Sequence, residues 1–181
     1  MKETIKLVAI LTAVCAVSAA MLAAVYNVTM GPIHRAIEIK IAEAASAVMP
    51  EYAPKAVKET VGGETFFISR GADGKVTAVA AEGVSPNGYG GEIRLMVGLS
   101  TDRKVINYSV IASKETAGLG TQIAEPEFKD QLKGQPFSAN WKVSKDGGDF
   151  DAVTSATISS KAAMECIRDA ISRYKKAAEN F

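Results

Sequence analysis

Five hydroxyl side chains lie within seven positions near the C-terminal end of the chain, directly before a segment with helical periodicity. They are Thr154, Ser155, Thr157, Ser159 and Ser160. The first turn of a helix has free backbone amides and the positive end of the helix dipole, so it can bind an anion such as phosphate. Ser and Thr are also favoured N-cap residues, and helix capping alone is the simpler interpretation of the cluster. The residues by themselves leave both interpretations open.

Two glycine-rich segments are further candidates for a binding site. Residues 114–121 read KETAGLGT, and their two glycines permit a tight turn and a close approach of the backbone to a ligand. Residues 86–93 read PNGYGGEI. They are not a dinucleotide fingerprint, because no strand, GxGxxG and helix follow one another there. Taken alone, the first segment is typical of an ordinary loop and the second of a β-turn.

The composition argues against several kinds of chemistry. The single histidine, His34, follows an apolar segment and is near no nucleophile motif, so we set hydrolases aside. Cys15 and Cys166 are too far apart for a CxxC zinc site or a disulfide framework, and no metal site is predicted. The formal net charge of +1 gives no sign of a surface that binds nucleic acid.

The N-terminal part of the chain predicts a membrane anchor. Residues 7–28 carry no charge, and about 20 helical residues cross the hydrocarbon core of a bilayer. A cleaved signal peptide is the alternative, but its apolar region is usually only about 7 to 15 residues long. Lys and Arg residues flank the segment on both sides, so charge does not decide its orientation.

A helical connector over residues 29–54 is predicted to follow the anchor. Gly31 and Pro32 are expected to break the first helix, with Pro32 at the first position of the next one. Apolar residues then recur at helical spacing, which is typical of an amphipathic helix that packs on a domain. They are Ile33, Ile37, Ile41, Ala45 and Val48.

Residues 55–181 predict one α+β domain. The β-rich runs 65–70 and 75–81 flank a glycine-containing turn, and the runs 92–100 and 105–113 repeat the arrangement. Two hairpins, and therefore an antiparallel sheet flanked by helices, are expected. Residues 127–133 predict a short helix, 141–144 a further strand, and 158–178 a final helix. Trp141 and Phe150 are interpreted as core residues rather than as a surface that stacks on a ligand.

The segment DAVTSAT, residues 151–157, resembles a known flavinylation motif, Asp-x-x-(Ser/Thr)-(Gly/Ser)-Ala-Thr. That motif belongs to the FMN-binding domain of the G subunit of the Rnf complex and of the C subunit of the sodium-pumping NADH:quinone oxidoreductase. In this family a separate flavin transferase uses FAD and magnesium to attach FMN to the last threonine through a phosphoester bond. The resemblance implies that Thr157 is the acceptor and that the transferase recognises the rest of the motif: Asp151, Thr154, Ser155 and Ala156.

Two details of the motif bear on its geometry. Ser155 stands where these subunits often have glycine, and this substitution makes the turn less permissive to positive φ. The phosphate is expected to be held by backbone amides near Ser159 and Ser160, without a lysine.

The two glycine-rich segments also resemble family sequence. Residues 114–121 are similar to a Glu-Thr-Pro-Gly-Leu-Gly segment that lines the flavin site, with Ala117 in place of proline. The resemblance implies flavin contacts for the matching residues: Glu115, Thr116, Gly118, Leu119 and Gly120. Residues 86–93 add Gly88 and Tyr89 as further candidates.

The resemblance implies an electron carrier with FMN as its cofactor and with no catalytic residue of its own. The length of 181 residues is closer to the Rnf G subunit than to the larger quinone-reductase homologue. The Rnf complex oxidises reduced ferredoxin, reduces NAD and couples this reaction to Na⁺ or H⁺ movement across the membrane.

The implied partners are the other membrane and iron–sulfur subunits of that complex, the flavin transferase and the membrane. Family topology places residues 1–6 in the cytoplasm and the flavin domain, anchored by one span, on the outer or periplasmic side of the cell (inner) membrane. Two alternatives stay open. One is the C subunit of the quinone reductase, and the other is a membrane-tethered module that binds a ligand without a covalent bond.

Overall fold

The computed structural model describes residues 2–51, 53 and 55–178. Its elements follow the order α1, β1 to β5, η1, α2, η2 and α3, where η marks a 3-10 helix. The chain divides into two compact units, one up to Lys40 and one from Ile41 onward. All the candidate site residues belong to the second unit.

α1 (Lys2–Ala47) is a single helix that contains the apolar segment. It is long and apolar enough to cross a membrane, and the described part of the chain buries none of its most apolar stretch. Large side chains such as Leu11 and Leu22 are 65% and 72% exposed. The prediction of an anchor over residues 7–28 therefore rests on a helix whose apolar surface has no protein partner among the described residues.

The predicted helix break at Pro32 is wrong, because α1 continues through this residue. A proline in a helix removes one backbone hydrogen bond, and the turns on either side keep theirs. One turn earlier, the Thr29 hydroxyl donates to the carbonyls of Val25 at 2.8 Å and Tyr26 at 3.3 Å. The long run of helix-forming residues before and after Pro32 outweighs the single missing bond.

The second unit is built on a five-stranded antiparallel sheet in which neighbours in sequence are also neighbours in space. The strands are β1 (Val57–Val61), β2 (Glu64–Arg70), β3 (Val76–Gly88), β4 (Gly91–Ser100) and β5 (Val105–Ala112). Both predicted hairpins are confirmed. β3 extends further than expected, so the glycine-rich residues 88–91 form the tip of the β3–β4 hairpin.

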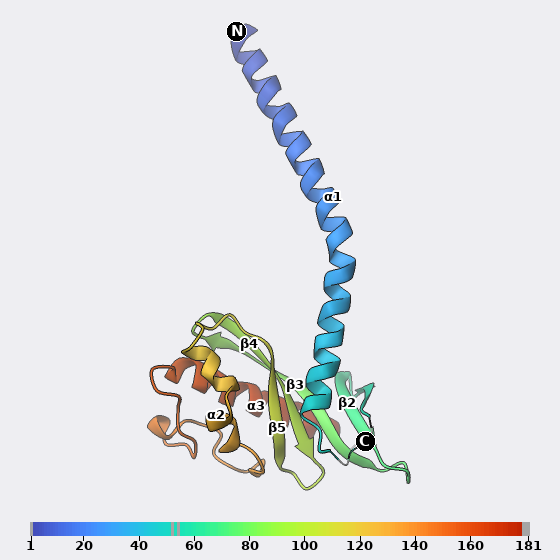
Figure 1. The fold of residues 1–181 in the computed structure, drawn as a ribbon, viewed down its shortest axis with the longest axis vertical. Coiled ribbons are helices and arrows are strands. Elements are labelled where there is room, and N and C mark those ends of the chain that lie inside the picture. Colours follow the sequence, from blue (N-terminus) through green and yellow to red (C-terminus); the bar gives the residue numbers. More distant parts are fainter. Residues whose placement is uncertain (1, 52, 54, 179–181) are drawn as a thin grey trace. The chain divides into compact units, whose positions relative to one another are not determined.

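Helices cover both faces of the sheet. α3 (Thr157–Ala177) packs against β3 and β4 (Figure 1). Its residue Ile167 is fully buried in the main core. Successive residues of a strand point to opposite faces, so Val79 joins this core while Ala80 does not. Ala80 packs with Met96 and with Val48, which directly follows the end of α1. The residues of the predicted connector that pack on the domain are thus its last ones.

α3 approaches β3 so closely that only glycine fits at one contact. A Cβ on Gly83 would clash with the backbone carbonyl oxygen of Cys166. The hydroxyl of Ser85 also donates to Glu165 of α3 at 2.6 Å, and the Val84 amide donates to Asp169 at 3.1 Å. These contacts fix α3 against the sheet and so fix where the helix begins.

Short elements connect β5 to α3. They are η1 (Gly120–Ala124), α2 (Pro126–Asp130) and η2 (Ser144–Asp146). The predicted helix over 127–133 is thus shorter than expected. The predicted strand over 141–144 is wrong, because this described stretch contributes only one isolated bridge, between Val143 and Phe150.

Trp141 stacks on Phe150 with ring centroids 4.8 Å apart, and both are buried, which confirms their core role.

Candidate functional site

The start of α3 lacks a side-chain cap. Its N-cap residue is Ala156, and within the described chain no side chain makes a capping hydrogen bond there. The first intrahelical bond runs from the Ser160 amide to the Ala156 carbonyl at 3.0 Å. The amides of the three residues between them have no acceptor inside the helix. Capping alone therefore does not explain the hydroxyl cluster, and these amides can bind an anion.

A tight turn before α3 places Thr157 at the first helical position. Ser155 has a φ of +63°, a left-handed conformation that non-glycine residues rarely adopt. The Ala156 amide donates to the Val153 carbonyl at 3.0 Å. The Ser160 hydroxyl accepts from the Val153 amide and donates to the Ala156 carbonyl, each at 3.0 Å. Ser160 is buried, and its two hydrogen bonds connect the turn to the first turn of the helix.

Glu115, three residues after β5, connects three separate segments. Its Oε1 accepts a hydrogen bond from the Gly90 amide at the hairpin tip, at 3.1 Å. Its Oε2 accepts from the hydroxyl of Ser159 in α3, at 2.7 Å. One carboxylate thus links the β3–β4 hairpin, the loop after β5 and the start of α3.

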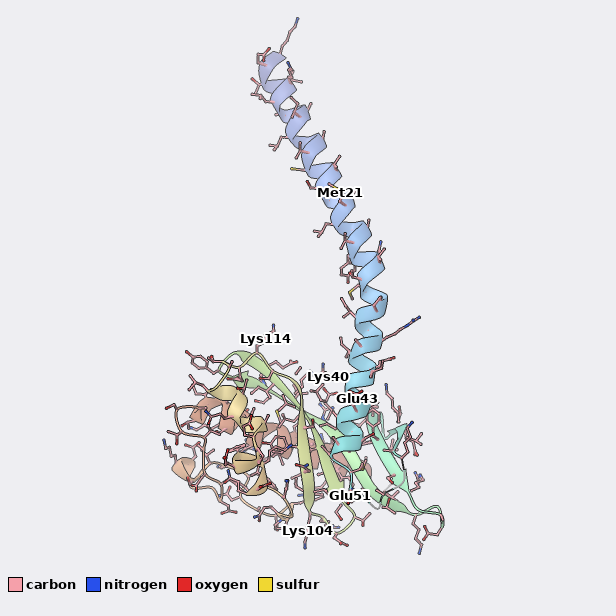
Figure 2. The ribbon with its side chains drawn as sticks, in the orientation of Figure 1. Met21, Lys40, Glu43, Glu51, Lys104 and Lys114 are labelled. Atoms are coloured by element: carbon pink, nitrogen blue, oxygen red, sulfur yellow. The ribbon has the colours of Figure 1, made fainter. Side chains whose placement is uncertain are left out.

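These three segments enclose a cavity of about 550 Å³. Its lining is formed by Tyr89, Glu115, Thr116, Leu119, Gly120, Ser155, Ala156, Thr157, Ile158 and Ser159. Figure 2 labels Lys114, which directly precedes Glu115, at the end of the sheet opposite to Lys104 in the β4–β5 turn. The cavity therefore belongs to the end of the sheet at which β5 finishes.

The cavity wall has an apolar part that is exposed. Tyr89, Leu119 and Ile158 are 72%, 45% and 50% exposed, and they come from the hairpin tip, the loop and the helix. Exposed apolar side chains that gather around one cavity are typical of a ligand site. Polar groups at the helix start lie beside this apolar surface, so the cavity suits a ligand with an anionic end and a flat apolar part.

The site residues predicted from the sequence lie at two places in the structure, the cavity and a groove beside it. Most of them line the cavity, as given above. Asp151 and Thr154 instead line a neighbouring groove with Gln131. The Gln131 side chain accepts from the Asp151 amide at 2.8 Å and donates to its carbonyl at 3.0 Å. Asp151 also accepts a hydrogen bond from the hydroxyl of Ser144 at 3.0 Å, which leaves Asp151 beside the cavity and outside its wall.

The remaining predicted residues shape the backbone around the cavity. A Cβ on Gly88 would lie 2.3 Å from the carbonyl oxygen of Gly91 and 2.7 Å from Glu115 Oε1, so glycine is required mainly by the backbone of the hairpin tip. Gly118 has a φ of +73°, which glycine adopts without strain.

Two parts of the site were not predicted from the sequence: Ile158 in the cavity wall and the backbone amide of Gly90. A helical pattern gives no signal for an exposed Ile at a binding site, and a backbone donor gives no signal at all.

Two buried titratable groups of the domain are structural. The hydroxyl of Tyr108 donates to the Ile123 carbonyl in η1, and burial raises the pKa of Tyr108. Burial also raises the pKa of the Cys166 thiol to about 12. A thiol that stays protonated is a poor nucleophile and a poor metal ligand. Within the described residues, no group of three or more His, Cys, Asp or Glu side chains is placed to hold a metal ion.

Comparison with protein families finds one match within this domain. Residues 88–172, which include the hairpin tip, the loop after β5 and most of α3, match the FMN-binding domain family. This part of the chain is therefore similar to FMN-binding domains.

Several curated relatives are named as the G subunit of an ion-translocating oxidoreductase complex. The protein from Shewanella baltica is 38% identical over 104 residues, which are 54% of this chain and 49% of that protein. The protein from Vibrio cholerae is 40% identical over 105 residues, 55% and 50% of the two chains. The protein from Shewanella oneidensis is 36% identical over 123 residues, 63% and 58% of the two. The chain therefore spans only about half the length of the curated relatives it matches.

Solved structures give a weaker similarity. The C subunit of the Na⁺-translocating NADH-quinone reductase from Parabacteroides distasonis superposes with a TM-score of 0.47 at 21% identity. The superposition covers 62% of this chain and 61% of that one. The corresponding protein from Shewanella oneidensis, NqrC, gives the same TM-score at 16% identity, over 69% and 66% of the two chains.

FMN fits the residues of this cavity. Its phosphate suits the free amides at the start of α3, and its aromatic ring system suits the apolar wall of Tyr89, Leu119 and Ile158. A volume of about 550 Å³ is within the range usual for cofactor sites, about 300 to 1,000 Å³. Thr157 is the threonine at the helix start that lines the cavity among the described residues.

Proposed function

We propose that this protein is a membrane-anchored flavoprotein subunit that relays electrons through FMN attached covalently to Thr157. The observation that carries the proposal is the position of Thr157. It is the first residue of an uncapped helix, it lines the cavity, and it ends a segment that resembles the flavinylation motif. The match of residues 88–172 to the FMN-binding domain supports the choice of cofactor.

The attachment is a transfer of FMN from FAD to the threonine hydroxyl. The Thr157 Oγ1–phosphorus bond forms, the phosphoanhydride bond of FAD breaks, AMP leaves, and the hydroxyl proton is released. The phosphodiester that remains carries one negative charge, which the positive end of α3 stabilises. When bound, FMN accepts and donates one or two electrons, and the residues of this chain hold and orient it.

The proposed setting is an Rnf-type complex that oxidises ferredoxin, reduces NAD and moves Na⁺ or H⁺ across the membrane. The relatives named as G subunits of an ion-translocating oxidoreductase complex support this setting. Its other membrane and iron–sulfur subunits, and a flavin transferase during maturation, are the proposed partners. The C subunit of a sodium-pumping NADH:quinone oxidoreductase is the second candidate, because residues 151–157 resemble the flavinylation motif of that subunit as well.

The proposed topology uses α1 as a single membrane span. Its apolar residues 7–28 cross the bilayer, the short N-terminal stub lies in the cytoplasm, and the flavin domain lies on the outer or periplasmic side. A covalent bond then prevents loss of a cofactor that could not be replaced on that side.

The test of this function is flavin fluorescence of the denatured protein in a gel. The full chain is co-expressed with a flavin transferase, and wild type is compared with Thr157→Ala, Thr157→Ser and the distant control Thr101→Ala. We expect a fluorescent band for wild type and Thr101→Ala, a dark band for Thr157→Ala, and fluorescence in Thr157→Ser because the hydroxyl is retained. The mass of the Thr157 peptide should increase by one FMN minus water.

A dark wild-type band would refute covalent attachment and favour a module that binds its ligand non-covalently. A second experiment distinguishes the two complexes. The protein is purified with its native partners, and electron transfer is measured with ferredoxin and with quinone. Activity with ferredoxin supports the Rnf-type setting, and activity with quinone alone supports the other.

A further inference from the structure

The cavity has an unusual charge distribution. Among its described lining residues, Glu115 has the only charged side chain, and no Lys, Arg or His lines the wall. The positive end of α3 lies beside the turn that carries Thr157 and is suited to the phosphate of the ligand. The cavity thus has one carboxylate and no side-chain cation among its described lining residues, and this carboxylate contacts Ser159 in the first turn of α3.

Glu115 is held firmly in this position. Its two oxygens accept hydrogen bonds from two different segments, the Gly90 amide at 3.1 Å and the Ser159 hydroxyl at 2.7 Å. Glycines at 88 and 120 lie against the same carboxylate, where a Cβ would come too close to Oε1 and Oε2 respectively. The Glu115 side chain is thus held by two hydrogen bonds and packs against two glycines.

This charge bears on the redox equilibrium of a bound flavin. Addition of two electrons and one proton to the neutral ring system leaves it with one negative charge. A fixed carboxylate in the same cavity repels that charge and so disfavours the reduced form. An unpaired carboxylate has a larger effect where protein partly excludes water than it would in bulk solvent.

We propose that Glu115 lowers the reduction potential of the flavin in this cavity through its charge, and so makes the domain a stronger electron donor. The proposal rests on the proposed function, because it requires FMN at Thr157. Removal of the charge should shift the ratio of reduced to oxidised flavin about tenfold at a fixed potential, which is about 30 mV for a two-electron couple.

A purely structural role of Glu115 makes a different prediction. Gln at this position can accept from the Gly90 amide and donate to the Ser159 hydroxyl, so Glu115→Gln retains the links while it removes the charge. Glu115→Asp retains the charge on a shorter side chain, and Glu115→Asn is its uncharged partner of the same length. Two pairs of matched shape therefore differ only in charge.

The experiment is a spectroelectrochemical titration of the full chain, purified in detergent after co-expression with a flavin transferase. Wild type, Glu115→Gln, Glu115→Asp and Glu115→Asn are compared at pH 7. Asp102→Asn, in the exposed turn between β4 and β5, is a control for the loss of a distant charge. We expect the uncharged member of each pair to have the higher potential, and Asp102→Asn to match wild type.

Equal potentials within both pairs, in proteins that carry flavin, would overturn the role of Glu115 and leave the proposed function intact. A shift that follows side-chain length and not charge would also overturn it. A wild-type protein without flavin would instead overturn the proposed function, and this inference with it. If Glu115→Gln takes up no flavin, the Asp and Asn pair decides the question.

Discussion

We expect Thr157→Ala to remove the flavin and to leave the free energy of unfolding within about 0.5 kcal/mol of wild type. Thr157 follows the N-cap residue Ala156, and no side-chain cap is present at this end of the described helix, so the substitution removes no capping bond. Loss of a half-buried methyl group costs at most about 0.8 kcal/mol. Alanine has the higher helix propensity, by about 0.5 kcal/mol, which offsets most of that cost. Replacement of a threonine at the N-cap position itself by alanine would instead cost about 1 kcal/mol of stability.

Ser160→Ala provides the contrast. The Ser160 hydroxyl is fully buried and makes hydrogen bonds with the Val153 amide and the Ala156 carbonyl. Its removal leaves a partly buried amide without a partner, at a cost of about 1 to 3 kcal/mol. Two substitutions three positions apart, each of which removes a hydroxyl, should therefore differ by about 2 kcal/mol in stability.

The assay is urea unfolding of the full chain in detergent, followed by the fluorescence of Trp141. This residue is the only tryptophan of the chain and is 3% exposed, so its emission reports the unfolding of the core. All variants are produced without a flavin transferase, because a bound flavin would stabilise only the proteins that retain Thr157. If Thr157→Ala were as destabilising as Ser160→Ala, the assignment of Thr157 as an uncapped first residue would be refuted.

Three further predictions concern the packing of α3 against the sheet. Gly83→Ala should destabilise the domain by about 1 to 3 kcal/mol, because its Cβ would clash with the Cys166 carbonyl and push α3 from the sheet. Urea unfolding checks this value, and a wild-type midpoint would contradict it. In a Cys15→Ser background, Cys166 should react with maleimide only after unfolding, since burial raises its thiol pKa to about 12. The thiol has a pKa of about 8.5 in the unfolded chain and about 12 in the folded one. The unfolded chain therefore loses this proton first, and the free energy of unfolding should fall as the pH rises between these two values.

The hairpins were predictable because turn chemistry and strand alternation agree there. Residues 71–74 contain two glycines and an aspartate between β-rich runs, and β2 and β3 form on either side. β1 (Val57–Val61) was missed, since a short strand with exposed Lys58 and Thr60 has little apolar pattern of its own and forms by pairing with β2.

Tertiary contacts account for the errors elsewhere. Trp141 and Val143 have the composition of a strand, but they are buried in the core beside Phe150, and the backbone there makes only an isolated bridge. At Pro32 the local rule predicted a break, whereas the long helix on both sides prevails. In the candidate site, too, local features could be predicted and tertiary contacts could not. The motif and the glycine loop could be found as local patterns, but the link from Glu115 to Ser159, 44 positions apart, requires the fold.

The choice of residue at the helix start shows how this site differs from an ordinary helix end. The positions around Ala156 hold serine and threonine, which cap helices well, while the cap position itself holds alanine. A serine or threonine there would stabilise the helix by about 1 kcal/mol and would occupy one of its free amides. The chain stabilises the turn instead through Ser160, whose hydroxyl lies on the buried side. The helix start thus has no side-chain cap among the described residues, and its first three residues, 157–159, line the cavity.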